Sequence, residues 1–363
     1  MNGHVSNLDD LWIRGVVMRK VLLRGLLVGG LALAVAVAAG LAAGGYHITK
    51  RISIPGDTGW DYITADTEGR RLYVPHGIEL VVLDLDTGAT VGKLTGQKGL
   101  HGVAVARDVG RGFLDATDPG SVTIFDLRTL AVVNKVRVGD DPNGIIYDPK
   151  TKRVFSADRG SKRLTAIDVT TGKIAATSGD LGGRTEHLAA DGDGHVFLNM
   201  QDLGTLLKLD ARDLRVMETW ALPGCGQPSS MDIDRAHARV FIGCRSGELA
   251  IVDGTNGKIV ATQAIGTGVD ALEFDPVKGL IFVSTGGGDG MLSIFHQDGA
   301  DKYSLVENVK TSPGARTMAL DHKTGMVYLP VANVGKAPEP TTDNPRPRAP
   351  MVPGSFSVLV VGQ

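Results

Sequence analysis

Short apolar strands that end in an aspartate recur along most of the chain at nearly constant spacing. The pattern occurs in VVLDLDTG, TIFDLRTL, TAIDVTTG, LKLDARDL, AIVDGTNG and SIFHQDG, which place Asp84, Asp126, Asp168, Asp210, Asp253 and His296 at the marker position. The steps between markers are 42, 42, 42, 43 and 43 residues. Self-similarity at a fixed period of roughly 20–50 residues is the signature of a repeat architecture. Between markers the chain shows short strands and Gly/Asp/Asn turns without helical periodicity, which predicts four-stranded units.

Seven segments have the pattern of an innermost strand, one for each predicted unit. They are WDYITAD, HGVAVARD, PNGIIYD, EHLAADGD, SSMDIDRA, DALEFDPV and RTMALDHK. The last unit has only three strands at the carboxyl end, and the spare strand His47–Ile54 can supply its missing outer one. Such closure pairs both chain ends and leaves only short edges. The sequence therefore predicts an all-β, seven-bladed β-propeller over residues 46–363.

The repeats resemble the YVTN-type β-propeller family, in which the first two strands read approximately P-x-G-I-A-V-x-P-D-G-R-R-V-Y-V. The stretches that carry the resemblance are PNGIIYDPKTKRVFS, TADTEGRRLYVPHG and DIDRAHARVFIGC. The resemblance covers residues 46–363 and implies the propeller fold. It implies no particular activity, because propellers host many unrelated sites.

The marker aspartates have two interpretations. One aspartate per blade, followed by a turn, favours hydrogen bonds to the turn backbone over a ladder of metal ligands. Net charge changes the picture little, because 38 Lys and Arg residues against 40 Asp and Glu give a formal charge of −2. Interspersed charges of both signs give no basic footprint for nucleic acid, so no nucleic-acid partner is expected.

Residues 1–45 have the pattern of an export segment. No charged residue occurs between Gly25 and Tyr46, and Arg14, Arg19, Lys20 and Arg24 precede this stretch. A positive region, an apolar region and small residues at its end describe a signal peptide, with cleavage expected near residues 39–45. The alternative is an uncleaved anchor, the only predicted contact with a membrane, since about 20 apolar residues can span a bilayer. Either interpretation predicts a periplasmic or secreted propeller.

The two cysteines fit an oxidising compartment. Cys225 lies in the loop that enters blade five, and Cys244 ends the second strand of that blade. Both thiols are therefore expected at the same end of one blade, where a disulfide is geometrically feasible. The alternative is two unpaired thiols, with Cys244 packed as a small apolar residue.

Aligning the repeats places one polar residue per blade at one mouth of the central channel. These residues form the mouth ring: Asp61, His101, Asn143, Glu186, Ser229, Asp270 and Arg316. Two positions further on, each blade has an apolar residue, which predicts a packed layer beneath a water-filled mouth. Any propeller mouth is wet and polar, but this does not account for three carboxylates, a histidine and an arginine together.

Two kinds of metal site are candidates at the mouth. A ring of second-strand ends brings His76 toward Asp61 and His101, and two imidazoles with a carboxylate are plausible ligands for a divalent transition metal. The oxygens of Asn143, Glu186 and Asp270 could instead suit a hard cation. Lactonase-type propellers hold a divalent cation at the top of the channel. The similarity to them is architectural, because none of their motifs occurs here.

A proline-rich stretch, residues 335–354, joins the second and third strands of blade seven. Its composition forbids helix or strand and favours extended backbone. It is expected to emerge beside the mouth, either as a disordered excursion or as a semi-rigid flap that carries Arg346 and Arg348.

Two functions follow from these features. The first is an exported binding module that holds a protein or small ligand at the mouth, because no catalytic motif supports the polar ring. The second is a metal-dependent hydrolase or lyase of lactonase-like type, in which the cation polarises a carbonyl and a ring residue moves the proton.

Overall fold

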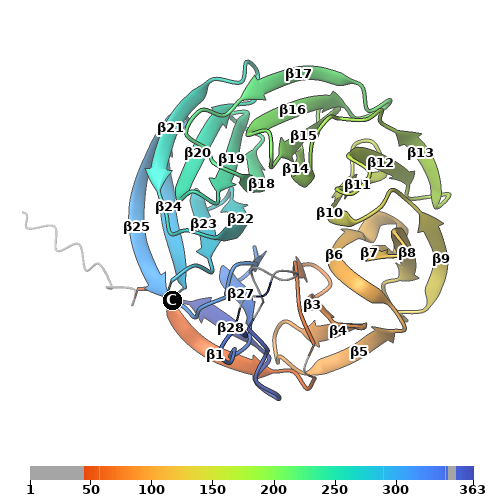
Figure 1. Ribbon diagram of the computed structural model, residues 1–363, viewed down its shortest axis with the longest axis vertical. Coiled ribbons are helices and arrows are strands. Elements are labelled where there is room, and N and C mark those ends of the chain that lie inside the picture. Colours follow the sequence, from red (N-terminus) through yellow and green to blue (C-terminus); the bar gives the residue numbers. More distant parts are fainter. Residues whose placement is uncertain (1–44, 57, 289, 340, 342–348) are drawn as a thin grey trace, which may run out of the picture. The chain divides into compact units, whose positions relative to one another are not determined.

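Twenty-eight strands form seven four-stranded antiparallel sheets, arranged as blades around a central channel (Figure 1). The computed structural model describes residues 45–56, 58–288, 290–339, 341 and 349–363, all within the compact unit Gly44–Gln363. Residues 1–44 of the predicted export segment, residues 1–45, lie outside the described residues. Among the described residues, no helix is both long enough and apolar enough to cross a membrane.

Each of the first six blades follows the chain from its innermost to its outermost strand. Blade one contains β2 (Thr64–Asp66), β3 (Arg71–His76), β4 (Glu79–Asp84) and β5 (Thr90–Thr95). Blade two contains β6 (Lys98–Ala106), the short helix η1 (Arg107–Val109), β7 (Arg111–Asp118), β8 (Ser121–Asp126) and β9 (Val132–Arg137). Blade three contains β10 (Pro142–Asp148), β11 (Arg153–Asp158), β12 (Arg163–Asp168) and β13 (Lys173–Thr177).

The next three blades repeat this order. Blade four contains β14 (Thr185–Ala190), β15 (His195–Met200), β16 (Thr205–Asp210) and β17 (Val216–Ala221). Blade five contains β18 (Pro228–Asp234), β19 (Arg239–Cys244), β20 (Glu248–Asp253) and β21 (Ile259–Ala264). Blade six contains β22 (Val269–Asp275), β23 (Leu280–Thr285), β24 (Met291–Gly299) and β25 (Lys302–Lys310).

Blade seven is made from both ends of the propeller. Its inner strands are β26 (Ala319–Asp321), β27 (Met326–Val331) and β28 (Ser357–Gly362), and β1 (His47–Ser53) completes it. The strands β1 and β28 pair from His47 opposite Gly362 to Ser53 opposite Ser357. The expected closure is therefore present, and the ladder ties residues some 310 positions apart, which removes the open edge that β28 would otherwise expose.

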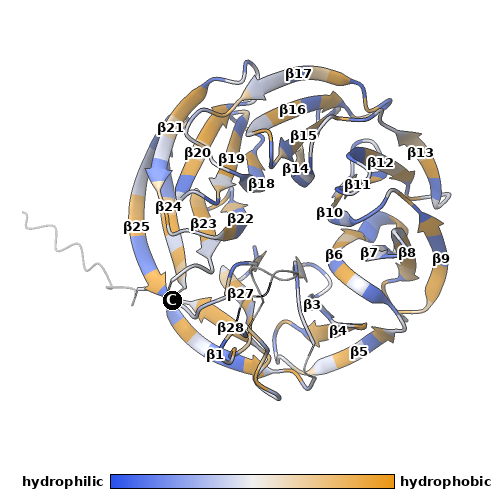
Figure 2. Ribbon diagram, viewed as in Figure 1, coloured by the Kyte–Doolittle hydropathy of each residue, from blue (hydrophilic) through white to orange (hydrophobic). Residues whose placement is uncertain are grey.

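The core lies between neighbouring blades and within them. One cluster packs Tyr73 and Val82 of blade one against Leu114 and Phe125 of blade two, all of them buried. Figure 2 shows hydrophobic residues along the strands of every blade. Because each sheet buries both faces against its neighbours, the ring is stabilised by repeated interfaces of the same kind.

The marker aspartates cap turns, as the repeat predicts. Asp84 Oδ1 accepts hydrogen bonds from the Asp86 and Thr87 amides at 3.1 and 2.8 Å. Asp126 and Asp168 make the same pair of bonds one and two blades on. These bonds lower the pKa of all three carboxyls and hold the turn after the third strand.

The proline-rich stretch leaves blade seven between β27 and β28. At its base the Gly335 amide donates to Pro350 O and the Val352 amide to Asn333 O, each at 2.8 Å. This short ladder brings the two ends of the excursion together. Arg346 and Arg348, proposed to face the mouth, lie outside the described residues.

Candidate functional site

The mouth ring is built from the amino ends of the innermost strands. His101, Asn143, Glu186, Ser229 and Asp270 lie near the starts of β6, β10, β14, β18 and β22, whereas Asp61 and Arg316 lie in the segments before β2 and β26. In these two blades the innermost strand is short, since β2 and β26 each have only three residues, so Asp61 and Arg316 precede the strand instead of lying in it. All seven residues therefore lie at one end of the inner strands, and six of them form three contacting pairs.

Asp61 and His101 form the first pair of the ring. Their carboxylate Oδ2 and imidazole Nδ1 are 3.0 Å apart. Burial alone would lower the pKa of His101, but the hydrogen bond and charge of Asp61 outweigh it and the pKa is raised. The buried Asp115 on β7, absent from the predicted ring, adds a further carboxylate beside His101, and it accepts the Gly102 amide at 2.6 Å.

Burial raises the pKa of Asp115 to about 7. Sequence reasoning missed this residue because it considered only residues at the ends of the second strands, such as His76. The available signal was an aspartate at the centre of the apolar segment GFLDAT, on the strand that pairs with β6.

Asn143 and Glu186 form the second pair. The Asn143 side-chain amide donates to Glu186 Oε1 at 3.1 Å. Glu186 is 3% exposed, and its other oxygen, Oε2, is buried without a hydrogen-bond partner among the described residues. Burial, with a smaller contribution from the charge of Asp270, raises the pKa of Glu186 to about 7.

Asp270 and Arg316 form the third pair, a carboxylate–guanidinium contact. Arg316 Nε donates to Asp270 Oδ2 at 2.7 Å, and Arg245 Nη1 approaches Oδ1 at 3.3 Å. Burial nevertheless raises the pKa of Asp270 against the influence of both guanidinium groups. Arg245, which follows β19 directly, was missed because the alignment assigned Cys244 to that strand's end.

Ser229 and His76 play different parts. Ser229 is fully buried and its hydroxyl donates to Val269 O at 2.7 Å, so it links blades five and six rather than facing the mouth. His76 stacks on Phe356 with ring centroids 4.1 Å apart, and burial lowers its pKa. No group of three or more His, Cys, Asp or Glu side chains that could hold a metal occurs in the described part of the chain.

A disulfide joins Cys225 and Cys244 in blade five. The Sγ atoms are 1.97 Å apart and the Cα atoms 5.1 Å apart. Both residues are buried, so the bond anchors the loop that leads into β18 to the end of β19.

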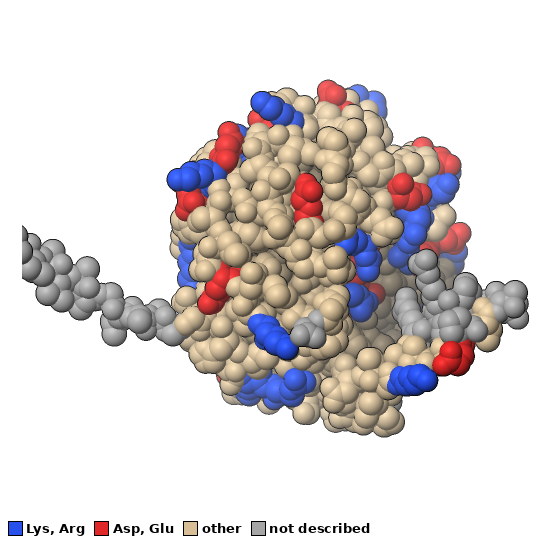
Figure 3. Space-filling view, turned by 60° about the vertical axis from the view of Figure 1, so that its left-hand side comes forward, with Lys and Arg blue, Asp and Glu red and all other residues tan. Residues whose placement is uncertain are grey.

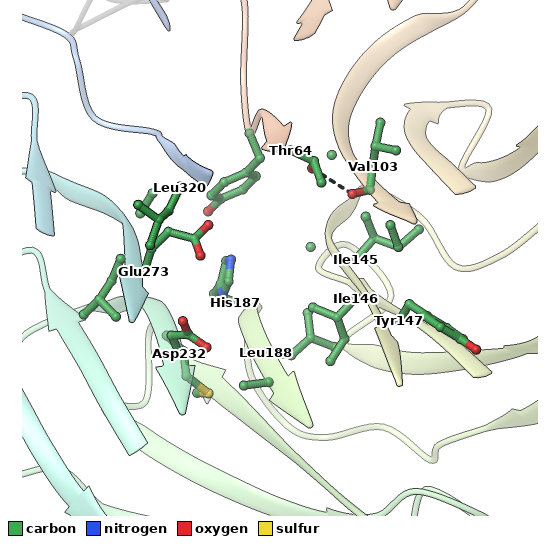
Figure 4. A pocket seen from close by; sticks show the side chains of 18 of the residues that line it. Thr64, Val103, Ile145, Ile146, Tyr147, His187, Leu188, Asp232, Glu273 and Leu320 are labelled. Atoms are coloured by element: carbon green, nitrogen blue, oxygen red, sulfur yellow. Dashed lines mark hydrogen bonds between the residues drawn. The ribbon is translucent and has the colours of Figure 1, made fainter. Parts of the chain in front are cut away.

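Beyond the mouth ring the channel is hollow. A cavity of about 380 Å3 is lined by residues from all seven blades (Figure 4). The apolar residues two positions beyond the ring all border this cavity: Ile63, Val103, Ile145, Leu188, Met231, Leu272 and Met318. The predicted packed layer is confirmed, because six of these side chains are buried in hydrophobic clusters of the blades and Ile145 packs against another. The clusters surround the axis and leave a cavity along it.

Four polar lining residues escaped the sequence reasoning. Tyr62, His187, Asp232 and Glu273 lie on or just before inner strands and border the cavity. The sequence did contain a signal for two of them. Asp232 and Glu273 are acidic residues inside predicted innermost strands, and they occupy the same repeat position in adjacent blades.

Comparison with known proteins identifies the fold and no family. No family model matches the chain, and no curated protein matches it, so the YVTN resemblance is not confirmed. The chain is similar to hydrazine synthase from Kuenenia stuttgartiensis, with 16% identity, a TM-score of 0.66 and coverage of 76% of this chain and 94% of that one.

Two further solved structures match over more of the chain. The WD40 repeats of RRP9 give a TM-score of 0.72 at 8% identity, covering 86% of this chain and 97% of that one. A chain of the mitotic checkpoint complex gives a TM-score of 0.71 at 13% identity, covering 87% of this chain and 92% of that one. The chain is therefore a seven-bladed β-propeller, an architecture that hosts many unrelated functions.

Proposed function

We propose that this chain is an exported binding module that holds a ligand at the mouth ring. The observation that carries the proposal is the Oε2 atom of Glu186, a buried carboxylate oxygen without a partner among the described residues. An unsatisfied buried acceptor costs about 1–3 kcal/mol, and an N–H or O–H group of a ligand would remove that cost.

The surroundings of Glu186 favour a polar ligand with both donors and acceptors. Glu186 and Asp270 offer carboxylate oxygens, while Arg245 and Arg316 hold their guanidinium groups beside Asp270. On the face seen in Figure 3, positively and negatively charged side chains are mixed. This face therefore has no patch of one charge sign that would compete with the mouth ring as a binding site. A small molecule or a polar protein loop has the groups to satisfy this ring.

A screen of ligands tests the proposal. Compounds that bind the folded chain raise its unfolding temperature by mass action. For each compound that does so, Glu186→Gln is expected to weaken binding, and Glu218→Gln on the exposed face of β17 serves as the matched control. Equal affinities of the wild type and Glu186→Gln for every such compound would remove the mouth from consideration.

The second candidate function, a metal-dependent hydrolase or lyase, draws support from the Asp61–His101 pair, which places a carboxylate 3.0 Å from an imidazole nitrogen. The proposed third metal ligand, His76, stacks on Phe356. The described residues contain no group of three or more His, Cys, Asp or Glu side chains placed to hold a metal ion. Metal analysis of chelator-free protein and an ester and lactone panel separate the two functions. Metal-dependent turnover that is lost in His101→Ala would favour the enzyme.

Export rests on the N-terminal pattern and agrees with the disulfide of blade five. Intact-mass measurement of the protein from the cell envelope and from the medium tests it. Cleavage near residues 39–45 is expected, and a full-length mass in the membrane fraction would indicate an anchor. A full-length mass confined to the cytoplasm would contradict export.

A further inference from the structure

The channel cavity is separate from the mouth ring. None of the seven ring residues belongs to its lining, which runs along the inner strands as far as Arg235 and His322, beyond the opposite strand ends. Its volume, about 380 Å3, falls within the range of about 300–1,000 Å3 typical of small-molecule pockets. An inference about this cavity therefore stands or falls independently of the proposed function.

The lining combines aliphatic side chains with polar and charged ones, and its acidic groups lie on one side. Asp232 on β18 and Glu273 on β22 are the acidic residues among those that line the cavity, and they come from adjacent blades. Figure 4 shows both side chains on the same side of the cavity as His187. The basic residues Arg235 and His322 also line the cavity, and their charges act on Asp232, whereas the charge that acts on Glu273 is the negative one of Asp232. Glu273 therefore needs either a proton or a cation, because buried charge without compensation is costly.

The two carboxyls differ in how far the protein satisfies them. Asp232 accepts hydrogen bonds from the Ile233 and Phe274 amides, each at 2.8 Å. Glu273 accepts none from the described residues, and the charge that acts on it is that of Asp232. Burial and this repulsion raise the pKa of Glu273 well above its usual range.

His187 supplies an independent sign of a missing partner. Its Nδ1 atom is buried and has no hydrogen-bond partner among the described residues. Its ring packs against Tyr62 with centroids 5.4 Å apart, and burial lowers its pKa to about 4. A neutral imidazole held there has one nitrogen able to accept a hydrogen bond.

We propose that the channel cavity binds a small organic cation, a primary ammonium on an apolar body. The ammonium group has three donors, which Glu273, Asp232 and His187 can accept, and its charge compensates the acid pair. The apolar body lies against the aliphatic part of the lining, which includes Val103, Ile145 and Leu188. Neither an anion nor a neutral apolar molecule would compensate the acid pair.

A metal ion fits these residues less well than an ammonium. Direct ligation needs several side chains at short, fixed distances, and the described residues contain no such group. An ammonium requires only acceptors within hydrogen-bond reach. Calcium is therefore the comparison cation in the test.

The test is calorimetric titration of the full chain with hexylammonium chloride, hexan-1-ol and calcium chloride. The wild type is expected to bind hexylammonium more tightly than hexan-1-ol, which has the same apolar body without the charge. Glu273→Gln is expected to weaken hexylammonium binding about tenfold or more, as loss of a hydrogen bond to a charged group implies. Glu218→Gln, the same change on the exposed outer strand β17, is expected to leave it unchanged.

Several results would overturn the proposal. They are no binding of hexylammonium by the wild type, equal affinity for hexan-1-ol, or an unchanged affinity in Glu273→Gln. Calcium binding that depends on Glu273 and displaces hexylammonium would assign a metal site instead. If Glu273→Gln does not fold, Asp232→Asn replaces it, and an unchanged affinity for hexylammonium in that variant would overturn the proposal in the same way.

Discussion

Individual side chains at the mouth are held in charge states that differ from those in water. Asp61 raises the pKa of His101 despite burial, whereas burial raises the pKa of Glu186 and Asp115 to about 7. Several groups of the mouth therefore exchange protons near neutral pH, and their replacement has measurable consequences.

The Asp61–His101 pair predicts a change in one histidine titration. In Asp61→Asn the counter-charge is lost while burial remains, so the pKa of His101 should fall. Histidine NMR titration measures it directly. Because its folded pKa is raised, His101 stabilises the fold below the pKa of the unfolded chain, and this is lost as pH rises through the folded value. An unchanged pKa in the variant would show that the contact is not formed in solution.

Glu186→Gln should stabilise the fold at neutral pH. The folded pKa of about 7 lies above the ordinary 4.5, so between these values the folded protein binds more protons than the unfolded chain. Stability therefore falls as pH rises through this window, by about 3 kcal/mol from this group. Urea unfolding should show little difference between wild type and variant at pH 4 and a more stable variant at pH 8. A pH-independent difference would argue against a buried, ionisable Glu186.

Neighbouring blades are also tied by a repeated arginine, which the sequence alone did not reveal. Arg71, Arg111 and Arg153 each begin the second strand of a blade and donate from Nη1 to a carbonyl just after the third strand of the next: Leu127, Val169 and Ala211. The repeat was visible as an arginine at the same place in four units, although the fourth, Arg239, bonds Asp301 instead. Its partner was not, because a backbone carbonyl leaves no mark in the sequence.

Arg153→Met tests these ties. The variant keeps much of the aliphatic stem but loses the bonds to Ala211 O and Arg212 O, which should lower the free energy of unfolding by about 1–2 kcal/mol. Arg137→Met is the control, because Arg137 pairs with Asp140 at 60% and 71% side-chain exposure and such pairs contribute little. Equal stabilities of the two variants in chemical denaturation would contradict the role of the ties.

The disulfide makes a prediction for blade five. Cys225 and Cys244 are 19 residues apart, and closing a loop of that size stabilises a fold by about 3 kcal/mol. Replacing both by serine should lower the free energy of unfolding by this order, and reductant should destabilise the wild type but not the double variant. Thiol titration of the unfolded, unreduced wild type should find no thiol, and two thiols per chain would refute the bond.

For the whole molecule, the ring of seven blades could be predicted because each blade repeats the same strands, turns and marker residue. The closure followed from counting: three strands at the carboxyl end, including β28, need one more, and His47–Ile54 was available. The hollow channel could not be predicted in this way. Whether side chains from seven blades meet across the channel depends on the diameter of the ring of blades. The identity of single lining residues, such as Ile145 or Leu188, does not determine that diameter.

The central claim is that the mouth ring holds a ligand through Glu186. A crystal structure of the protein with a compound that stabilises it in the screen tests this claim most directly. The account predicts density at the mouth, with a donor of the ligand within hydrogen-bond distance of Glu186 Oε2 and the blades unchanged. A compound bound only on the outer strands, with the ion pair between Arg316 and Asp270 and the surrounding mouth unaltered, would contradict it.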